Sequence, residues 1–189
     1  MNSNEDYTYA VMCSQVYLEK FRGVLYTPNQ SDARTRIPFV ADKQTFLRLS
    51  AYGEKIAKLE KIDHQVTNVL GYDYEDICNN VPHDFKIIPK QPFDDVNEEL
   101  VLKNDEEEIR IHCPLYLQKL SIAGYEIIKT WLKFHSFACT HCTCSGDDIR
   151  ELLDFLNSLA QHVRFVADID EIMHSVIDEK VTLISPAAN

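Results

Sequence analysis

Apolar residues recur at spacings of three and four positions near the beginning of the chain. This spacing is the period of one face of an α-helix, and it predicts one amphipathic helix from about Asp6 to Leu25. Gly23 and then Thr27-Pro28 end this helix, because proline cannot continue the backbone hydrogen bonding. Its predicted apolar face is formed by Ala10, Cys13, Tyr17, Phe21 and Leu25.

A second helical pattern follows a polar loop from Asn29 to Arg36. Ile37-Pro38-Phe39 is expected to be extended, since proline restricts the residue before it to extended conformations. Asp42 is placed to cap the helix, which then runs to about Lys61. The predicted buried face of this helix holds Phe46, Leu49, Ile56 and Leu59.

Polar and apolar residues alternate in two short segments in the middle of the chain, Glu99–Lys103 and Glu108–His112. Alternation with a period of two is typical of half-buried strands, and a polar turn that begins at Asn104 separates the two segments. We therefore predict a β-hairpin. The stretch from Asp63 to Gln91 lacks a clear period and contains prolines, which indicates loop with short pieces of structure.

The apolar run that follows the hairpin is ambiguous at its start and becomes helical from about Gly124. Ser145 then caps a long helix whose first turn holds Asp147 and Asp148, where carboxylates favour the helix dipole. The apolar stripe of this helix continues to about Met173, and the tail from residue 181 is expected to be frayed. The inward positions of the shorter helix are expected to be Ile127, Ile128, Trp131 and Leu132.

These elements predict an α+β fold, a helix-rich single domain with a small antiparallel β-hairpin or sheet and a long C-terminal helix. A length of 189 residues suits one domain with its own core. Within residues 1–189 we expect an N-terminal helical segment over 1–62, a loop-rich acidic β region over 63–120 and C-terminal helices over 121–178.

Charge is distributed unevenly along the chain. The net charge of −11 is made of +1 over residues 1–70, with 9 Lys and Arg against 8 Asp and Glu, and −12 over residues 71–189, with 10 against 22. Affinity for nucleic acid comes largely from Lys and Arg that displace counterions, so the acidic part is expected to repel a phosphate backbone. No apolar stretch approaches the ~20 residues of a membrane span, and the polar N-terminus does not resemble a signal peptide. We therefore expect a cytoplasmic protein without a membrane partner.

Sequence motifs for familiar enzyme chemistry are missing. The chain has no GxxxxGK[ST] phosphate loop, no GxGxxG motif after a strand, and neither HExxH nor GxSxG. It also lacks the Gly-rich loop and the Asn-Pro-Pro segment of an adenine methyltransferase. We therefore expect no cofactor and no enzyme activity. An enzyme with an unrecognised site is the alternative.

One cluster, formed by Cys139, His141, Cys142 and Cys144, places four potential zinc ligands within six residues. Structural zinc sites usually pair such a cluster with a second one roughly 12 to 20 residues away. The sequence has no second cluster, so we predict a thiol-bearing loop and no metal site. The six cysteines are expected to be reduced, because a chain of this length holds a core without disulfides. The acidic run from Asp105 to Glu108 is interpreted as a solvated hairpin tip.

Two separated parts of the chain carry a family resemblance. In the first, TYAVMCSQVYLEKFRGVL precedes TRIPFVADKQTFLRLSAYGEKIAKLE, and in the second, LSIAGYEIIKTWLKF precedes DDIRELLDFLNSLAQHVRFVADID. The chain resembles the C-terminal specificity region of Type ISP restriction–modification enzymes and related large adenine-specific DNA methyltransferases. The matching motifs lie at Tyr9–Phe21, Arg36–Asp42, Ile122–Lys133 and Asp148–Asp170.

The resemblance implies a helix-rich target-recognition module. In that family the region lies behind a methyltransferase core, often with a helicase–nuclease as well, and helps to recognise the DNA target. The implied partners are a methyltransferase or restriction subunit and double-stranded DNA. We expect four cations to contact the DNA in a local basic strip, because arginine forks suit phosphates and guanine edges and lysines suit phosphates. These residues are Arg34, Arg36, Lys129 and Lys133.

The acidity of the chain supports a second hypothesis. Regularly spaced carboxylates compete with DNA for a basic cleft, and charge complementarity speeds such an encounter. The chain would then be an acidic protein-binding module, a DNA mimic or decoy that inhibits a DNA-binding or restriction enzyme. Acidic surfaces also serve solubility alone. The sequence leaves both hypotheses open.

Overall fold

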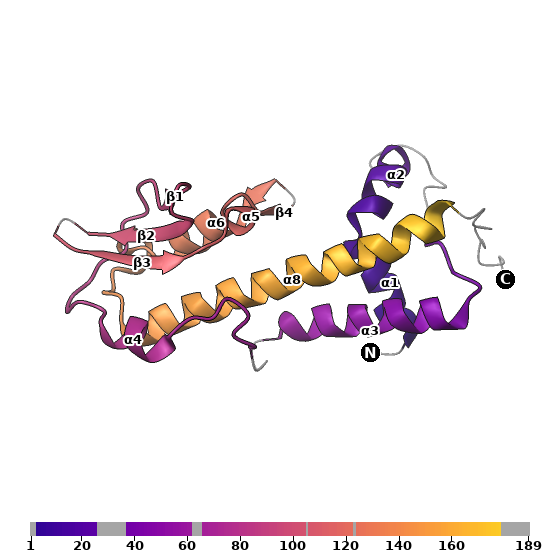
Figure 1. The fold of residues 1–189 in the computed structure, drawn as a ribbon. Helices are drawn as coiled ribbons and strands as arrows, with labels where there is room; N and C mark the ends of the chain where they lie inside the picture. Colours follow the sequence, from indigo (N-terminus) through magenta and orange to yellow (C-terminus); the bar gives the residue numbers. More distant parts are fainter. Residues whose placement is uncertain (1–2, 26–36, 62–65, 105, 123, 179–189) are drawn as a thin grey trace. The chain divides into compact units, whose positions relative to one another are not determined.

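The computed structural model describes five stretches of the chain, residues 3–25, 37–61, 66–104, 106–122 and 124–178. The chain divides into two compact units. Figure 1 colours the elements of both units by their order in the sequence. The helical unit comprises residues 1–65 and 161–189, and the mixed unit comprises residues 66–160. The long helix α8 (Gly146–Asp178) begins in the mixed unit and ends in the helical unit.

The described part of the helical unit contains three helices besides the second half of α8. They are α1 (Ser3–Cys13), α2 (Gln15–Leu25) and α3 (Lys43–Leu59). All four helices contribute side chains to one apolar core, because each has an apolar stripe to bury. The buried residues of this core are Tyr7, Ala10, Val11, Tyr17, Leu49, Ile56, Ile169, Ile172, Met173 and Val176.

The prediction of a single helix from about Asp6 to Leu25 is wrong, because the chain forms two helices with a break at Ser14. The Ser14 hydroxyl accepts a hydrogen bond from the Tyr17 N–H (3.1 Å) and donates one to the Asp170 carboxylate (2.6 Å). Asp170 also accepts a hydrogen bond from the Val16 N–H (3.2 Å). Ser14 therefore acts as a buried N-cap of α2. Its carboxylate partner, Asp170, lies far along the chain. The spacing of apolar residues in α1 and α2 therefore does not reveal this contact.

Helix α3 begins where the sequence predicts. Asp42 is its N-cap, and its carboxylate accepts a hydrogen bond from the Thr45 N–H at 2.7 Å. That backbone hydrogen bond holds the pKa of Asp42 below its usual value. The helix ends at Leu59, two residues before the predicted end. Gly53 lies against α1, since a Cβ built on it would stand 1.9 Å from the Asp6 carbonyl oxygen.

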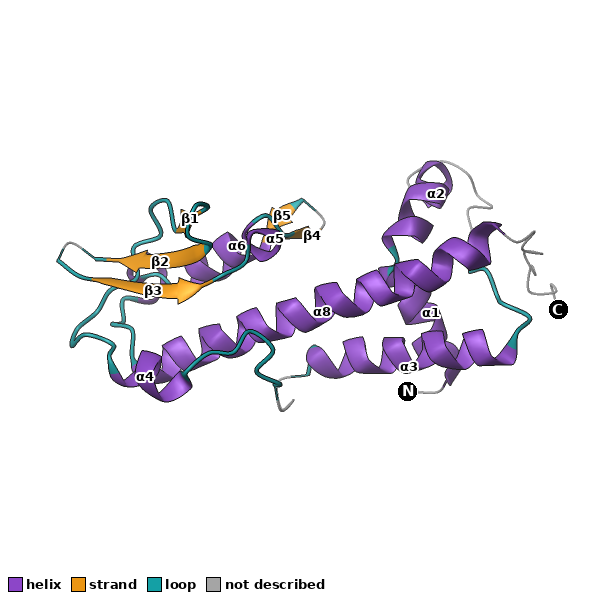
Figure 2. Cartoon of the chain, in the orientation of Figure 1, coloured by secondary structure: helices purple, strands orange, loops and turns teal. Residues whose placement is uncertain are grey.

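The mixed unit holds a three-stranded antiparallel sheet, drawn as orange arrows in Figure 2. Its strands, in the order β1-β2-β3, are β1 (Phe93–Asp94), β2 (Glu99–Lys103) and β3 (Glu108–His112). The predicted hairpin is confirmed, with Val101 opposite Arg110. Side chains alternate between the two faces of the sheet. The side chains that enter the core are Leu100, Leu102 and Ile111, each at most 2% exposed.

Short elements surround this sheet. They are α4 (Tyr74–Asn79), α5 (Leu115–Gln118), β4 (Ser121–Ile122), β5 (Tyr125–Glu126), α6 (Ile127–Phe134) and α7 (Phe137–Thr140). The helix predicted from about Gly124 begins instead at Ile127. Gly124 has φ 83° and forms the turn between β4 and β5, a backbone conformation that glycine adopts readily. Ile128 and Leu132 are buried as predicted, whereas Ile127 and Trp131 are partly exposed.

Ser145 caps α8 as predicted. Its hydroxyl accepts a hydrogen bond from the Asp148 N–H (3.3 Å), and the Asp148 carboxylate accepts one from the Ser145 N–H (2.7 Å). This reciprocal pair satisfies two backbone donors at the start of the helix. The predicted apolar stripe continues past Met173 to Val176. Its fully buried residues in the mixed unit are Ile149, Leu152, Leu153 and Leu156.

The predicted fold class is confirmed, because the described residues form a helix-rich α+β structure with a small antiparallel sheet and a long C-terminal helix. The single domain and its division into 1–62, 63–120 and 121–178 stay a prediction. The loop expected over residues 29–36 and the tail expected from residue 181 lie outside the described residues. Across the described helices, none combines the length and apolarity that a membrane crossing requires.

Candidate nucleic-acid interface

An open groove crosses the outer face of the three-stranded sheet in the mixed unit. Its volume is about 610 Å³, which lies within the range of about 300–1,000 Å³ that is usual for ligand pockets. The strand alternation that buries Leu100 and Ile111 turns their neighbours outward, toward this groove. The residues that give the groove its chemistry are Phe93, Asp94, Asp95, Lys103, Arg110 and Lys129.

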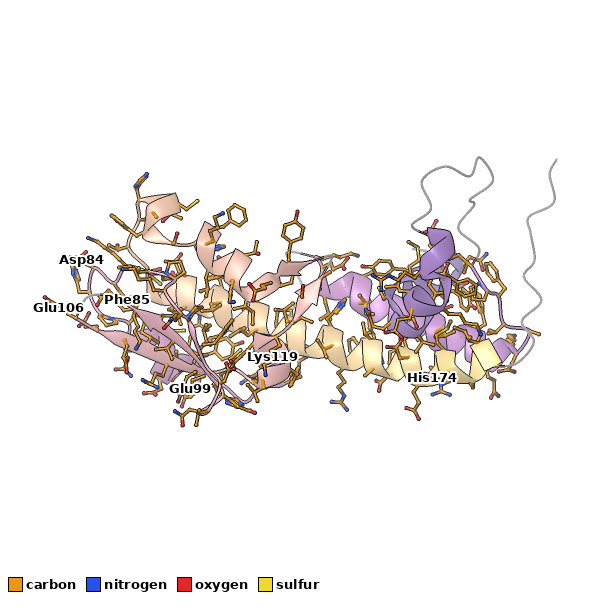
Figure 3. The ribbon with its side chains drawn as sticks, turned by 90° about the horizontal axis from the view of Figure 1, so that it is seen from above. Asp84, Phe85, Glu99, Glu106, Lys119 and His174 are labelled. Atoms are coloured by element: carbon orange, nitrogen blue, oxygen red, sulfur yellow. The ribbon has the colours of Figure 1, made fainter. Side chains whose placement is uncertain are left out.

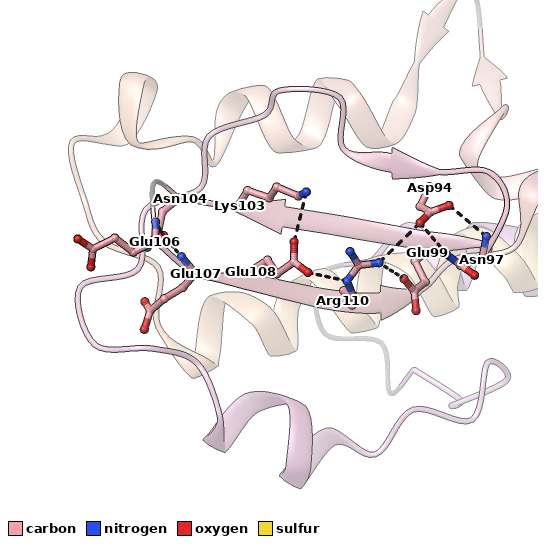
Figure 4. A network of polar contacts seen from close by, with 9 residues as sticks. All are labelled: Asp94, Asn97, Glu99, Lys103, Asn104, Glu106, Glu107, Glu108 and Arg110. Atoms are coloured by element: carbon pink, nitrogen blue, oxygen red, sulfur yellow. Dashed lines mark hydrogen bonds and ion pairs between the residues drawn. The ribbon is translucent and has the colours of Figure 1, made fainter.

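Arg110 is the centre of a network of charged side chains on this face (Figure 4). Its Nε donates to Glu108 Oε1 at 2.8 Å, and its Nη1 donates to Glu99 Oε2 at 2.7 Å. The same Nη1 lies 3.6 Å from Asp94 Oδ2. These hydrogen bonds raise the pKa of Arg110, and the hydrogen bond between Arg110 and Glu108 lowers the pKa of Glu108. The guanidinium is thus held in one orientation by carboxylates from all three strands.

The two lysines of the groove are also paired. Lys103 Nζ lies 3.2 Å from Glu108 Oε2, and Lys129 Nζ lies 2.6 Å from Glu126 Oε1. The ammonium group of Lys129 lies over the ring of Phe93, 5.7 Å from its centre. Each groove cation therefore has a carboxylate partner within the unit, and a DNA phosphate would have to compete with it.

The structure brings two of the four cations predicted to bind DNA onto one helix. Lys129 and Lys133 are one turn apart on α6, so both project from the same face. Lys133 is exposed and makes no ion pair with any described residue. Arg34 and Arg36 lie outside the described residues. The expected strip of all four cations therefore stays a prediction.

Helix α3 carries a basic stripe that the sequence prediction missed. Arg48, Lys55 and Lys58 are all exposed, and their spacing of seven and three residues places them on one helix face over about 15 Å. Lys58 pairs with Glu54 at 2.6 Å, whereas Arg48 has no ion pair among the described residues. Lys55 lies over the ring of Tyr52 at 4.9 Å.

The cysteine cluster forms no metal site in the described structure. All six cysteines are free thiols, as predicted. Cys139 and Cys142 are exposed, Cys144 is partly buried, and no group of three or more metal-ligating side chains occurs among the described residues. The backbone N–H of Cys144 donates to the carbonyl of Phe85 at 2.6 Å, which ties this segment to the core of the mixed unit.

The acidic run at the end of the β2–β3 hairpin is exposed, as predicted for a solvated tip. Glu106 projects from the tip into solvent (Figure 3). The Asn104 side chain accepts hydrogen bonds from the Glu106 and Glu107 N–H groups (2.9 and 2.6 Å), and these bonds stabilise the turn. Asp105 lies outside the described residues. These side chains offer negative charge to a partner and no cation to a phosphate.

Buried thiols and phenols are kept protonated in both units. Burial raises the pKa of Cys113 and that of Cys144 to about 12, and it raises the pKa of Cys13 to about 11. Burial also raises the pKa of Tyr74 to about 12. A thiol is nucleophilic as its thiolate, so these shifts disfavour nucleophilic chemistry at these cysteines near neutral pH.

A mixed fold with a charged groove and basic helix faces is typical of a recognition module. The family model described as Type ISP C-terminal specificity domain matches residues 5–141. The match covers most of the chain, and the chain therefore belongs to this family. It includes three of the motifs recognised in the sequence, those at Tyr9–Phe21, Arg36–Asp42 and Ile122–Lys133. No curated protein and no solved structure matches the chain significantly.

Proposed function

We propose that this chain is a non-catalytic target-recognition module of a restriction–modification or DNA-methyltransferase system. It binds double-stranded DNA together with a partner catalytic subunit in the cytoplasm, and it needs no cofactor of its own. The observation that carries the proposal is the family match over residues 5–141, whose description is a specificity domain. The protonated buried thiols agree with a role in binding, because they offer no activated nucleophile.

Contacts to the phosphate backbone come from the exposed cations. The basic stripe of α3 supplies Arg48, Lys55 and Lys58, and α6 supplies Lys129 and Lys133. Arg34 and Arg36, which precede α3 in the sequence, are proposed to contact DNA as well. Phosphate contacts fix the position and orientation of a protein on the duplex and are independent of sequence. The net charge of −11 makes such binding weak at physiological salt, which is one reason for a partner subunit.

Binding of the full chain to a random-sequence duplex across a salt series tests this proposal. We expect the logarithm of the binding constant to fall linearly with the logarithm of salt concentration, with a slope of about 0.9 for each phosphate contact. Replacing Arg48, Lys55 and Lys58 together by Gln removes up to about 2.7 from that slope. The matched control replaces three lysines of the mixed unit by Gln, which changes the net charge equally and leaves the slope as it was. These control residues are Lys86, Lys90 and Lys119.

The partner is sought by capture of the full chain from its native host. Recovery of a methyltransferase or nuclease subunit, with tighter DNA binding by the joint complex, supports the proposal. DNA binding with the same salt slope in all variants would contradict the assignment of the α3 stripe. Absence of DNA binding both alone and with the captured partner would overturn the proposed function.

The acidity of the mixed unit favours a second candidate. Residues 66–160 hold 8 Lys and Arg against 17 Asp and Glu, a net charge of −9. A DNA mimic or decoy would use this charge to occupy the basic cleft of a DNA-binding enzyme. The same capture experiment separates the two functions. A mimic displaces DNA from the captured enzyme, whereas a recognition module increases DNA retention.

A further inference from the structure

The groove on the sheet combines hydrogen-bond donors with acceptors at nearly balanced charge. Its lining contains three cations, Lys103, Arg110 and Lys129, and two carboxylates, Asp94 and Asp95. The carboxylate partners of those cations lie beside it and make the local charge negative. Such a site disfavours a free phosphate. It suits a neutral polar ligand that offers both acceptors and donors, which is the chemistry of a base edge.

One edge of the Arg110 guanidinium is unused. Nε and Nη1 are engaged by Glu108 and Glu99, whereas Nη2 makes no hydrogen bond or ion pair with any described residue. Its two N–H donors are therefore available in the groove. Because the carboxylates already fix the side chain, little rotamer entropy is lost when these donors bind a ligand.

An acceptor lines the same groove as these donors. Asp95 follows directly after β1, is exposed in the groove, and makes no ion pair with the described residues. Its neighbour Asp94 is fixed differently, because its carboxylate accepts hydrogen bonds from the Asn97 N–H (3.1 Å) and Nδ2 (2.8 Å). The groove thus presents a guanidinium edge that is held in place and an exposed carboxylate.

We infer that this groove reads the major-groove edge of a G·C base pair. Arg110 Nη2 donates one hydrogen bond that the O6 and N7 acceptors of guanine share, and the Asp95 carboxylate accepts from the amino group of the paired cytosine. Arginine on guanine and a carboxylate on the cytosine amino group are pairings that base geometry favours, and a two-stranded β-ribbon such as β2–β3 fits the major groove. This inference rests on the proposed function, because it requires that the chain binds duplex DNA.

The first test selects bound sequences from a pool of random duplexes with the full chain and sequences the enriched fraction. We expect an enriched motif that contains a G·C position. Arg110→Lys keeps the positive charge but has a single nitrogen, which Glu99 and Glu108 engage, so selection at one G·C position should fall by about 5-fold, the lower end of the range for a good bidentate pair. Arg150→Lys on α8 is the matched control and should enrich the motif of the unchanged chain.

The second test uses a chemical change in the DNA. In the selected duplex, 7-deazaguanine at the G·C position removes the N7 acceptor. The unchanged chain should lose affinity for this duplex, whereas Arg110→Lys should bind both duplexes equally, because the donor that reads N7 is already gone. Asp95→Ala leaves the Arg110 network intact and should relax selection for cytosine at the same position.

Outcomes of these tests separate the inference from the proposed function. DNA binding that enriches no motif, or a G·C preference that survives both Arg110→Lys and Asp95→Ala, overturns the base-reading groove and leaves the recognition module standing. Failure of the unchanged chain to bind any duplex, with or without the captured partner, overturns both. Circular dichroism would show whether Arg110→Lys unfolds. In that case the test of the base-reading groove rests on Asp95→Ala and on the binding of the unchanged chain to the 7-deazaguanine duplex.

Discussion

The two compact units differ in charge as well as in architecture. The helical unit, residues 1–65 and 161–189, holds 11 Lys and Arg against 13 Asp and Glu, whereas the mixed unit holds 8 against 17. The basic stripe, in which only Lys58 has an ion pair among the described residues, lies on α3 in the nearly neutral unit, and the groove whose cations are all paired lies in the acidic one. Sequence-independent attraction and base discrimination need different chemistry. We therefore propose that the helical unit supplies most of the attraction to DNA and that the mixed unit supplies the discrimination between bases.

The cores of the two units are also built differently. The helical unit buries apolar stripes of four helices in one cluster. The mixed unit ties short segments together with hydrogen bonds from side chains, such as Tyr72 Oη to the His112 carbonyl (2.6 Å) and Leu70 N–H to Asn157 Oδ1 (2.9 Å). Stability in the first unit therefore depends on the packing of helices, with a buried polar pair between Ser14 and Asp170. In the second it depends on packing together with polar pairs that join short segments.

The largest expected effect comes from a core truncation in each half of α8. Leu153 and Ile169 are fully buried, one in each unit, so either change to Ala should lower the free energy of unfolding by about 2–5 kcal/mol. Hydrogen exchange measured by mass spectrometry should locate the loss of protection in the mixed unit for Leu153→Ala and in the helical unit for Ile169→Ala. Equal loss throughout the chain in both variants would show that the units unfold as one.

A smaller effect is expected where backbones approach closely. In Gly53→Ala the new Cβ would stand 1.9 Å from the Asp6 carbonyl oxygen, so α1 and α3 must move apart, at a cost of about 1–3 kcal/mol. Gly23→Ala is the control, because its Cβ meets nothing within 4 Å and alanine favours a helix by up to ~1 kcal/mol. Thermal unfolding should rank Gly53→Ala below the unchanged chain and Gly23→Ala at or above it. The reverse ranking would contradict the close packing of the two helices.

The break between α1 and α2 predicts a loss of about 1–2 kcal/mol for Ser14→Ala. The change removes the N-cap of α2 and a hydrogen-bond donor to the Asp170 carboxylate. Ser175→Ala is the control, since its hydroxyl donates only within its own helix, to the Ile172 carbonyl. Urea unfolding at neutral pH measures both. Equal midpoints for the two variants would show that Ser14 is not the origin of the break.

The smallest expected effect is a decrease in the stability of the helical unit in mild acid. Burial lowers the pKa of His162 below its usual value of 6.5. Below about pH 6.5 the folded chain therefore binds fewer protons than the unfolded chain. The contribution of His162 to stability is complete above about pH 6.5 and decreases as the pH falls from there through the lowered pKa of the folded state. The slope should stay well under about 1.4 kcal/mol per pH unit, because the imidazole is only half-buried.

His162→Gln should flatten this part of the stability curve between pH 7 and pH 5, and the exposed His174→Gln should leave it unchanged. Figure 3 shows His174 on the outside of α8. Chemical denaturation at several pH values is the measurement. A curve that steepens in His162→Gln would reverse the assigned sign.

The elements that sequence alone predicted are those whose signal is local. The hairpin follows from two short segments of apolar and polar residues around a polar turn, and Asp42 and Ser145 identify helix starts through short-range hydrogen bonds. The break at Ser14 depends on Asp170, which no local pattern reveals. The turn at Gly124 was hidden inside an apolar run that fits both a helix and a strand.

The candidate site was partly predictable for the same reason. Lys129 was expected to bind DNA and lines the groove. The groove itself depends on strand register, which places Arg110 opposite Val101 and beside Glu99 and Glu108. Arg110 in the sequence is one charge in an acidic stretch, and only the sheet shows that its neighbours hold it. The stripe on α3 repeats with a helical period, but that spacing does not distinguish a DNA contact from an ordinary solvated helix face.

The boundary between the units has a consequence for engineering. Domains are usually separated by linkers, yet residues 160 and 161 are consecutive within the 33-residue helix α8. A chimera that exchanges the mixed unit for a relative's must therefore be joined once between residues 65 and 66 and once inside a continuous helix. One residue gained or lost at the second junction would rotate residues 161–178 by about 100° about the helix axis relative to residues 146–160. Transplanting specificity within this family requires grafts that keep helical phase.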